Sequence, residues 1–174
     1  MPHWLNRLRT SLRKVMRLRS CQVRHVRLSL PEWLEERLKE IPDSYKLMAA
    51  TIMPRPIAWV VTKDQQGQVN AAPYSFFNVM GSAPPTIALG LLADPERGFK
   101  DTARNILDTG EFVINLVPER LVAAMNLTAV DAPRGVDELA LAGLETLPST
   151  HIAPPRIAES PVAFECVSLS SVVT

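Results

Sequence analysis

The chain has 174 residues, of which 47% are hydrophobic and 21% charged, and its formal net charge is +1. This length suits one ordinary domain, and this balance of apolar and charged residues excludes a wholly disordered chain. No apolar run approaches the roughly 20 residues that a transmembrane helix needs. The two cysteines, Cys21 and Cys166, are too few and too far apart for a disulfide framework or a metal cluster, so we expect a reducing, cytoplasmic setting.

Charge is distributed unevenly along the chain. Residues 1–40 carry ten Lys and Arg against four Asp and Glu, whereas residues 41–174 carry nine against fourteen. The first 28 residues place leucine and valine at helical spacing among basic side chains, which is a basic amphipathic pattern. We expect residues 1–28 to be a poorly ordered basic leader, with a membrane-surface or targeting helix and a nucleic-acid arm as alternatives. No nucleic-acid or membrane partner is expected elsewhere in the chain.

A short capped helix and a linker are predicted for residues 29–44. Ser29 is followed three residues later by Glu32, as in a capping box, and Pro31 lies in the first turn. From residue 45 onward the pattern changes, and residues 45–174 are predicted to form the one domain that holds the core.

Five strands are predicted from apolar runs that are rich in β-branched residues. The first two, residues 56–62 and 69–73, flank the turn KDQQG and therefore form a hairpin. The others cover residues 86–92, 111–117 and 162–173.

Three helices are predicted between these strands. The first covers residues 100–110, where Asp101 can cap its start and Gly110 ends it. The second covers residues 118–129, and the third is short and lies around 136–145. These helices are too few for regular βαβ alternation, so the pattern favours a mainly β fold, an antiparallel barrel with appended helices.

The start of the first of these helices, KDTARN, is a candidate phosphate site. A helix N-terminus presents unpaired backbone N–H groups and the positive end of the helix dipole, and Lys100 and Thr102 add a cation and a hydroxyl. Asp101 would repel a phosphate, so we expect its carboxylate to cap the helix and point aside. An ordinary capped surface helix is the alternative interpretation.

The stretch VNAAPYSFFN, residues 69–78, is poor in the bulky residues that strands prefer. Ala71, Ala72 and Ser75 are small enough to let a planar ring approach the main chain, and Pro73 sets a bend. The neighbouring aromatic side chains are candidates for the lining of such a cavity. A plain core strand is the alternative.

Arg55 lies between two prolines, in the sequence MPRPIAW. The prolines restrict the backbone on both sides, so the guanidinium is presented rigidly. Such a group suits a phosphate or a carbonyl-rich ring edge, and a surface salt bridge is the alternative.

Several familiar signatures are missing from the chain. It contains no GxGxxG, P-loop, CxxC or HExxH sequence, and its three histidines are isolated. Neither a metal site nor a Ser/His/Asp triad is therefore predicted.

Five motifs, in this order along the chain, resemble the flavin reductase-like family, the FMN-binding split barrels that include flavoredoxin. They are RPIAWVVT, VNAAPYSFFN, APPTIALG, KDTARNI and GEFVINLVPE, and PPRIAESPVAFEC near the end is also similar to that family. The resemblance runs from about residue 45 to residue 166. It implies a Greek-key split barrel, a homodimer, and FMN, or else FAD, held near the subunit interface.

Matched by position, the resemblance implies two groups of cofactor-binding residues. Along the flavin it places Arg55, Thr62, Asn70, Ala71, Pro73, Tyr74, Ser75, Phe76 and Asn78. Around the phosphate end it places Lys100, Asp101, Thr102 and Asn105.

The activity that the resemblance implies is hydride transfer from NAD(P)H to flavin, with free flavin or a partner protein as electron acceptor. The cofactor supplies this chemistry, so no catalytic side chain is predicted. Two alternatives remain: an FMN-binding electron-transfer protein without its own NAD(P)H activity, and an inactive truncated member. The second arises because family members generally continue beyond SLSSVVT, so the barrel here is expected to lack strands and leave an unpaired edge.

Overall fold

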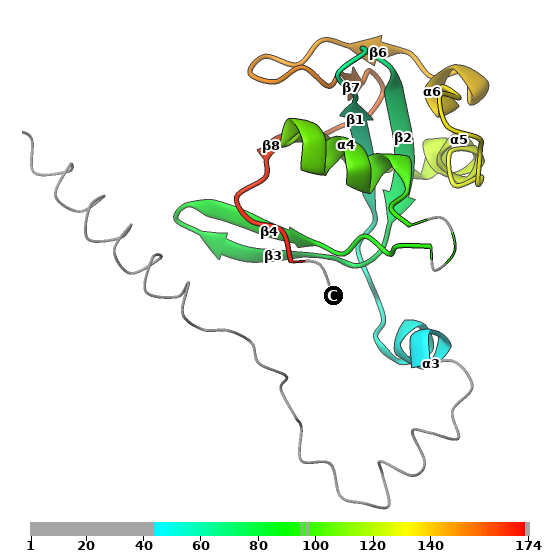
Figure 1. Cartoon of the computed structure of the whole chain (residues 1–174). Coiled ribbons are helices and arrows are strands. Elements are labelled where there is room, and N and C mark those ends of the chain that lie inside the picture. The colour runs from blue at the N-terminus through cyan, green and yellow to red at the C-terminus, as the bar shows by residue number, and fades with distance from the viewer. Residues whose placement is uncertain (1–43, 95, 97, 173–174) are drawn as a thin grey trace, which may run out of the picture. The chain divides into compact units, whose positions relative to one another are not determined.

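The computed structural model describes residues 44–94, 96 and 98–172 (Figure 1). Helix α3, Ser44–Thr51, belongs to a first unit that ends at Ile52, and Met53–Thr174 form a second compact unit. The basic leader and the predicted capped helix lie outside the described residues. Within those residues, no helix is long and apolar enough to cross a membrane.

Four antiparallel strands form the main sheet of the second unit. They are β1 (Ala58–Lys63), β2 (Val69–Tyr74), β5 (Glu111–Asn115) and β8 (Ala163–Val167), in the order β2-β1-β5-β8. Each coincides with a predicted strand, although the last ends well before residue 173. The KDQQG turn joins β1 to β2 as predicted, because Asp64 Oδ1 accepts the backbone N–H groups of the two residues at 66 and 68, at 2.9 and 2.8 Å.

Two smaller antiparallel sheets accompany the main one. Strand β3 (Phe77–Ser82) pairs with β4 (Pro85–Leu89), and β6 (Thr146–Leu147) pairs with β7 (Arg156–Ile157). The predicted fold class, mainly β with appended helices, is confirmed. Over the described residues the strands do not close into a barrel.

The helical segments fall where they were predicted, with two differences. The predicted 118–129 helix divides into a 3₁₀ turn, η2 (Glu119–Leu121), and α5 (Val122–Leu127), and the third helix, α6 (Glu138–Leu141), is a single turn. Helix α4 is Asp101–Thr109. Its end is as predicted, because Gly110 adopts a left-handed φ of 75° and donates its N–H to Ile106 O.

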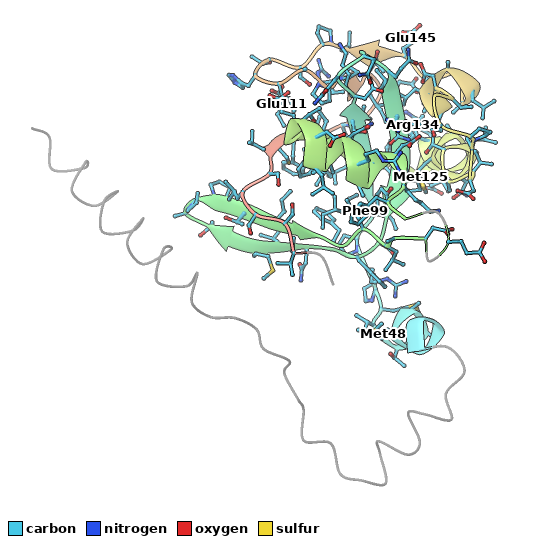
Figure 2. All side chains as sticks on the ribbon, viewed as in Figure 1. Met48, Phe99, Glu111, Met125, Arg134 and Glu145 are labelled. Carbon is cyan, nitrogen blue, oxygen red and sulfur yellow. The ribbon has the colours of Figure 1, made fainter. Side chains whose placement is uncertain are left out.

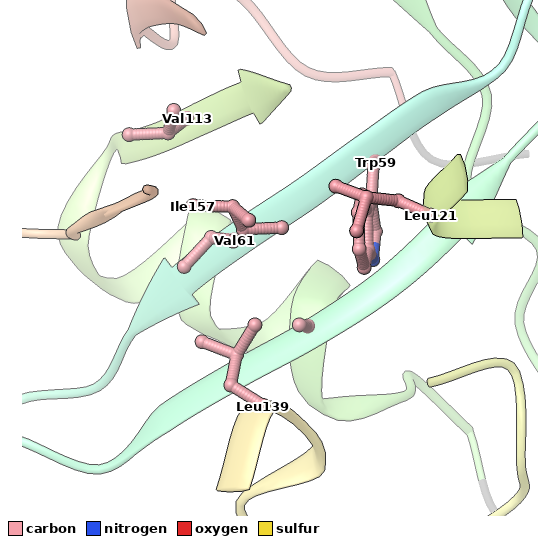
Figure 3. Close-up of a cluster of buried hydrophobic side chains, with 7 residues drawn as sticks. Trp59, Val61, Val113, Leu121, Leu139 and Ile157 are labelled. Carbon is pink, nitrogen blue, oxygen red and sulfur yellow. The ribbon is translucent and has the colours of Figure 1, made fainter. Parts of the chain in front are cut away.

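Strand β1 is buried on both faces, which explains why its sequence is an unbroken apolar run. Trp59 and Val61 point to one face, into the cluster drawn in Figure 3, which α6 and β7 complete with Leu139 and Ile157. Ala58 and Val60 point to the opposite face. There they pack with Ile106 of α4, Phe112 and Ile114.

Three helices lie around β2, which is an edge strand of the main sheet over the described residues. In Figure 1, α4 crosses one face of β1 and β2, and α5 and α6 lie beside β2; residue contacts link each of these three helices to that strand. The edge of β2 is therefore the place where the sheet and three helices meet.

Candidate functional site

A cleft of about 420 Å³ opens along the edge of β2. Its lining comes from β2, from Asp94 with the residues between Gly98 and the first turn of α4, from the loop of residues 128–134 that follows α5, and from Glu138 of α6. Arg134 and Phe99, labelled in Figure 2, lie on this side of the unit and both line the cleft. The volume falls within the range of roughly 300–1,000 Å³ that is common for small-molecule sites.

A chain of side-chain hydrogen bonds forms one wall of the cleft, centred on Asn70. Its Oδ1 accepts the Thr102 hydroxyl at 2.6 Å and lies 3.4 Å from the Thr62 hydroxyl, which donates to it. Asn105 Nδ2 in turn donates to Thr62 Oγ1 at 3.0 Å. Thr62, Thr102 and Asn105 are all buried, so these bonds are shielded from competing water.

Glu138, at the start of α6, lines the cleft and completes the network. Its Oε1 accepts Asn70 Nδ2 and its Oε2 accepts the backbone N–H of Ala71, each at 3.1 Å. That N–H points away from β1, toward the open edge of β2. Without the Glu138 carboxylate it would be a buried donor without a partner. The backbone nitrogen of Pro73, two residues further along β2, points to the same edge. It carries no hydrogen and so needs no partner.

Tyr74 contributes a phenol to the cleft beside this network. Burial raises the pKa of its hydroxyl above the ordinary value, and the Glu138 and Asp101 carboxylates act in the same direction. A hydrogen bond with the Thr102 side chain opposes that rise in pKa. The hydroxyl therefore stays protonated at neutral pH.

Three basic side chains, Lys100, Arg104 and Arg134, stand among the cleft residues. Lys100 Nζ lies 3.5 Å from an Asp131 oxygen, and both guanidinium groups lie 3.9 Å from Asp101 Oδ1. The three basic side chains are 36% to 56% exposed, and ion pairs of this kind stabilise little. The cations can therefore turn toward an anionic ligand at small cost.

The predicted cap of α4 is wrong. Lys100 is the N-cap residue and makes no side-chain cap bond, while Asp101 is the first helical residue. Its carboxylate does not cap the helix because it lies between the Arg104 and Arg134 guanidinium groups. It points aside from the backbone N–H groups, as expected, but an ion pair and not a cap holds it there.

The structure brings most of the thirteen proposed cofactor residues together. Six of them line the cleft, and two more, Thr62 and Asn105, are buried behind it in the hydrogen-bond network. The side chain of Ala71 belongs to the core, and only its N–H takes part. The six that line the cleft are Asn70, Pro73, Tyr74, Lys100, Asp101 and Thr102.

The other four do not line the cleft. Arg55 Nε donates to Ser75 Oγ at 3.3 Å, and its guanidinium lies 5.8 Å from the centre of the Phe76 ring. These three residues therefore form a separate cluster. Asn78 is exposed on β3, where its Oδ1 accepts the N–H of Val79.

Sequence reasoning missed several cleft residues. Arg104 stands within the KDTARN motif, and its spacing of three residues from Asp101 was a usable signal. Glu138 gave no such signal, because a glutamate at the start of a short helix is ordinary and its partner Asn70 is 68 residues away. Arg134 comes from a loop whose position depends wholly on the tertiary fold.

The family of the chain follows from a comparison with known domains. Residues 48–174 match the model of the flavin reductase like domain. The chain belongs to this family. The resemblance seen in its motifs is thereby confirmed.

Known relatives agree with this assignment. An uncharacterized protein of Deinococcus radiodurans is 43% identical over 141 residues, which cover 78% of this chain and 62% of the relative. The crystal structure of nitrilotriacetate monooxygenase component B from Bacillus cereus is 39% identical, with a TM-score of 0.69, and covers 72% of this chain and 61% of that one. The 2-nitrobenzoate 2-nitroreductase NbaA of Pseudomonas fluorescens is 36% identical, with a TM-score of 0.61, and covers 82% and 64%.

These relatives are longer than the chain. It spans about three fifths of the length of the curated relatives and solved structures that it matches.

Proposed function

We propose that the chain binds FMN in the cleft along β2 and acts as an NAD(P)H:flavin oxidoreductase. The observation that carries the proposal is the composition of the cleft. A hydroxyl and amide network on β2 and α4 stands beside three basic side chains, two at the start of α4 and one on the loop of residues 128–134, in a chain of the flavin reductase like family. Two solved relatives above 35% identity, a monooxygenase component and a nitroreductase by name, support redox chemistry.

The cleft residues fit the parts of FMN in turn. Lys100 and Arg134 suit the phosphate, together with the N–H groups that begin α4. The half-buried Ala72 and Pro73 leave room for a flat ring against β2, and the phenol of Tyr74 would lie beside that ring. Bound flavin would supply the hydride-accepting chemistry, which no side chain here can supply.

The chain's own residues then have three tasks. The basic side chains bind the phosphate, Asn70 and its hydroxyl partners orient the ligand, and the apolar layer beneath β2 keeps water from the buried side of the cleft. None of these tasks requires a side chain to act as acid or base in the reaction.

The experiment is to purify the whole chain, record its visible spectrum, and identify any released flavin by mass. FMN at about one molecule per chain supports the binding site, and steady-state oxidation of NADH and NADPH then tests the reductase activity. A chain that binds FMN but oxidises neither nucleotide is instead the electron-transfer protein of the alternative reading. A chain that stays colourless and takes up no added FMN contradicts the proposal.

We also propose that the chain forms a homodimer. The chain has a mass of 19.3 kDa, and light scattering of the purified protein should give twice this value if it forms the homodimer that the family resemblance implies. A monomeric mass at concentrations where flavin is bound would show that the cleft does not need a second subunit.

A further inference from the structure

The amide of Asn70 has a hydrogen-bond acceptor at its nitrogen and hydrogen-bond donors at its oxygen. Its Nδ2 faces Glu138 Oε1 at 3.1 Å, and its Oδ1 faces the Thr102 hydroxyl at 2.6 Å and the Thr62 hydroxyl at 3.4 Å. Glu138 is 7% exposed, so its carboxylate meets these groups in a place that water barely reaches.

This arrangement permits one orientation of the amide. A carboxylate only accepts hydrogen bonds, so the donor end of Asn70 must face Glu138, and the acceptor end must then face the hydroxyls. The reversed amide would place its oxygen against a carboxylate oxygen, two buried acceptors with no proton between them. The N–H of Ala71 holds the other carboxylate oxygen at 3.1 Å, which fixes Glu138 itself.

The fixed Asn70 amide in turn orients the hydroxyl of Thr102, which lines the cleft. Each threonine hydroxyl has one proton, and Asn70 Oδ1 directs the proton of Thr102 toward β2. Thr62 receives a hydrogen bond from Asn105 Nδ2, so its own proton is left for Asn70. With its proton on Asn70, the Thr102 oxygen is left as an acceptor on the side of the Tyr74 phenol and the cleft.

We propose that Glu138 is a positioning residue of the flavin site: it orients the Asn70 amide and, through it, the Thr102 hydroxyl that faces the ligand. The inference rests on the proposed function, because it assigns the network a role toward bound flavin. A purely structural role would make Glu138 only the partner of the Ala71 N–H on the edge strand. The two roles can be separated.

The decisive variant exchanges the two functional groups, Asn70→Asp with Glu138→Gln. In the exchanged pair, the amide at position 138 accepts from the Ala71 N–H and donates to the carboxylate at position 70. The other oxygen of that carboxylate then accepts from Thr102 and Thr62. Each single change, in contrast, disturbs the network. Asn70→Asp leaves two carboxylates facing each other, whereas Glu138→Gln leaves an amide nitrogen against Asn70 Nδ2 unless Asn70 turns over, which takes its acceptor oxygen away from Thr102.

Flavin dissociation constants are measured for the wild-type chain, both single variants and the exchanged pair. FMN and riboflavin are both used, because the exchange moves a negative charge from one cleft residue to another, and riboflavin has no phosphate for that charge to repel. Each single change should weaken riboflavin binding about tenfold or more. The exchanged pair should recover to within about threefold of the wild type. Recovery of folding by the pair, where a single variant does not fold, shows only that the Asn70–Glu138 hydrogen bond supports the fold, and it does not count for the proposal.

Two further variants separate positioning from structure. Thr102→Val should weaken binding in the wild type and in the exchanged pair, but should add little to Glu138→Gln, because that variant has already lost the placement of Thr102. The control is Glu145→Gln, the same chemical change at an exposed residue away from the cleft, which should leave both dissociation constants unchanged.

The outcomes distinguish the inference from the function on which it rests. If the wild-type chain binds neither flavin, the proposed function fails and the inference fails with it. If the wild type binds but the exchanged pair is no better than the weaker single variant, only the inference is overturned. Full additivity of Thr102→Val and Glu138→Gln would likewise overturn it, because it would show that Glu138 does not act through Thr102.

Discussion

Tyr74 is a cleft residue whose pKa the structure shifts in a clear direction. Burial favours the neutral phenol, so its pKa in the folded chain lies above the ordinary value of 10.0. The unfolded chain then loses this proton first as the pH rises. The contribution of Tyr74 to stability is therefore complete below pH 10 and is lost as the pH rises from 10 through the folded pKa.

This shift can be measured cleanly because the chain has only one other tyrosine, Tyr45. In a Tyr45→Phe variant, the tyrosinate absorbance should appear with a midpoint above pH 10, and the same variant in urea should titrate near 10. A folded-state midpoint at or below 10 would show that Tyr74 is in contact with water. Bound FMN, if it covers the phenol, should raise the midpoint further.

Gly90 is required by a close approach and not by its backbone angles. A Cβ at this position would lie 2.9 Å from the Cβ of Phe76, whose carbonyl accepts the Gly90 N–H at 2.6 Å. Gly90→Ala should therefore lower the free energy of unfolding by about 1–3 kcal/mol, as overpacking does. Phe76 must shift to relieve the contact, and it would carry the Arg55 guanidinium with it.

Gly81 provides the matched control for this change. An added Cβ there meets its nearest neighbour, Pro84 O, at 3.5 Å, which is an ordinary contact. Urea unfolding should show Gly81→Ala within about 0.5 kcal/mol of the wild type. Equal losses from both substitutions would mean that loss of glycine flexibility, and not contact with Phe76, decides the effect.

At the scale of elements, one buried hydrogen bond joins the main sheet to the loop that lines the cleft. Trp59 of β1 donates its indole N–H to Thr128 Oγ1 at 2.9 Å, and Thr128 ends α5 where that loop begins. Thr128→Val keeps the shape of the side chain but leaves a buried donor unpaired. We expect the free energy of unfolding to fall by about 1–3 kcal/mol.

Thr128→Ser is the companion variant, because it keeps the hydroxyl and removes only a methyl group. It should retain most of the stability that Thr128→Val loses, as measured by urea unfolding of both chains. If the serine variant is as unstable as the valine variant, packing of the methyl group is what matters. The hydrogen bond to Trp59 would then contribute little.

The sequence predicted elements where a local signal was strong. The β-branched run of β1, the Asp64 turn and the αL cap at Gly110 are each encoded within a few residues, and each was predicted correctly. Strand β3 was missed as a separate element because FNVMGS mixes an asparagine and a glycine with apolar residues. The two-residue strands β6 and β7 are too short to leave a pattern.

Only the part of the candidate site that β2 and α4 form was predictable from the sequence. Asn70, Lys100 and Thr102 lie in motifs that could be read locally, and the fold places all three in one cleft. Glu138 and Arg134 come from the segment after α5, and only tertiary packing brings them to β2. Asp101 was misplaced because its partners are guanidinium groups, one of them on that same distant segment.

At the scale of the whole molecule, binding and folding are linked. A ligand that binds only the folded chain stabilises it by about 2.7 kcal/mol when its concentration is 100 times the dissociation constant. For a chain of this size, such a gain should raise Tm by roughly 5–10 °C. FMN should therefore shift the thermal unfolding of this protein in proportion to the logarithm of its concentration.

A comparison of the Tm shifts that FMN and riboflavin cause tests the basic side chains around the cleft. It lacks the phosphate that Lys100 and Arg134 are proposed to bind, so at equal concentration it should raise Tm by less than FMN does. Lys100→Ala should reduce the FMN shift toward the riboflavin shift and leave the riboflavin shift unchanged. Equal shifts for the two flavins in the wild type would place the phosphate away from α4, in solvent, and would leave the ring alone to account for the binding energy.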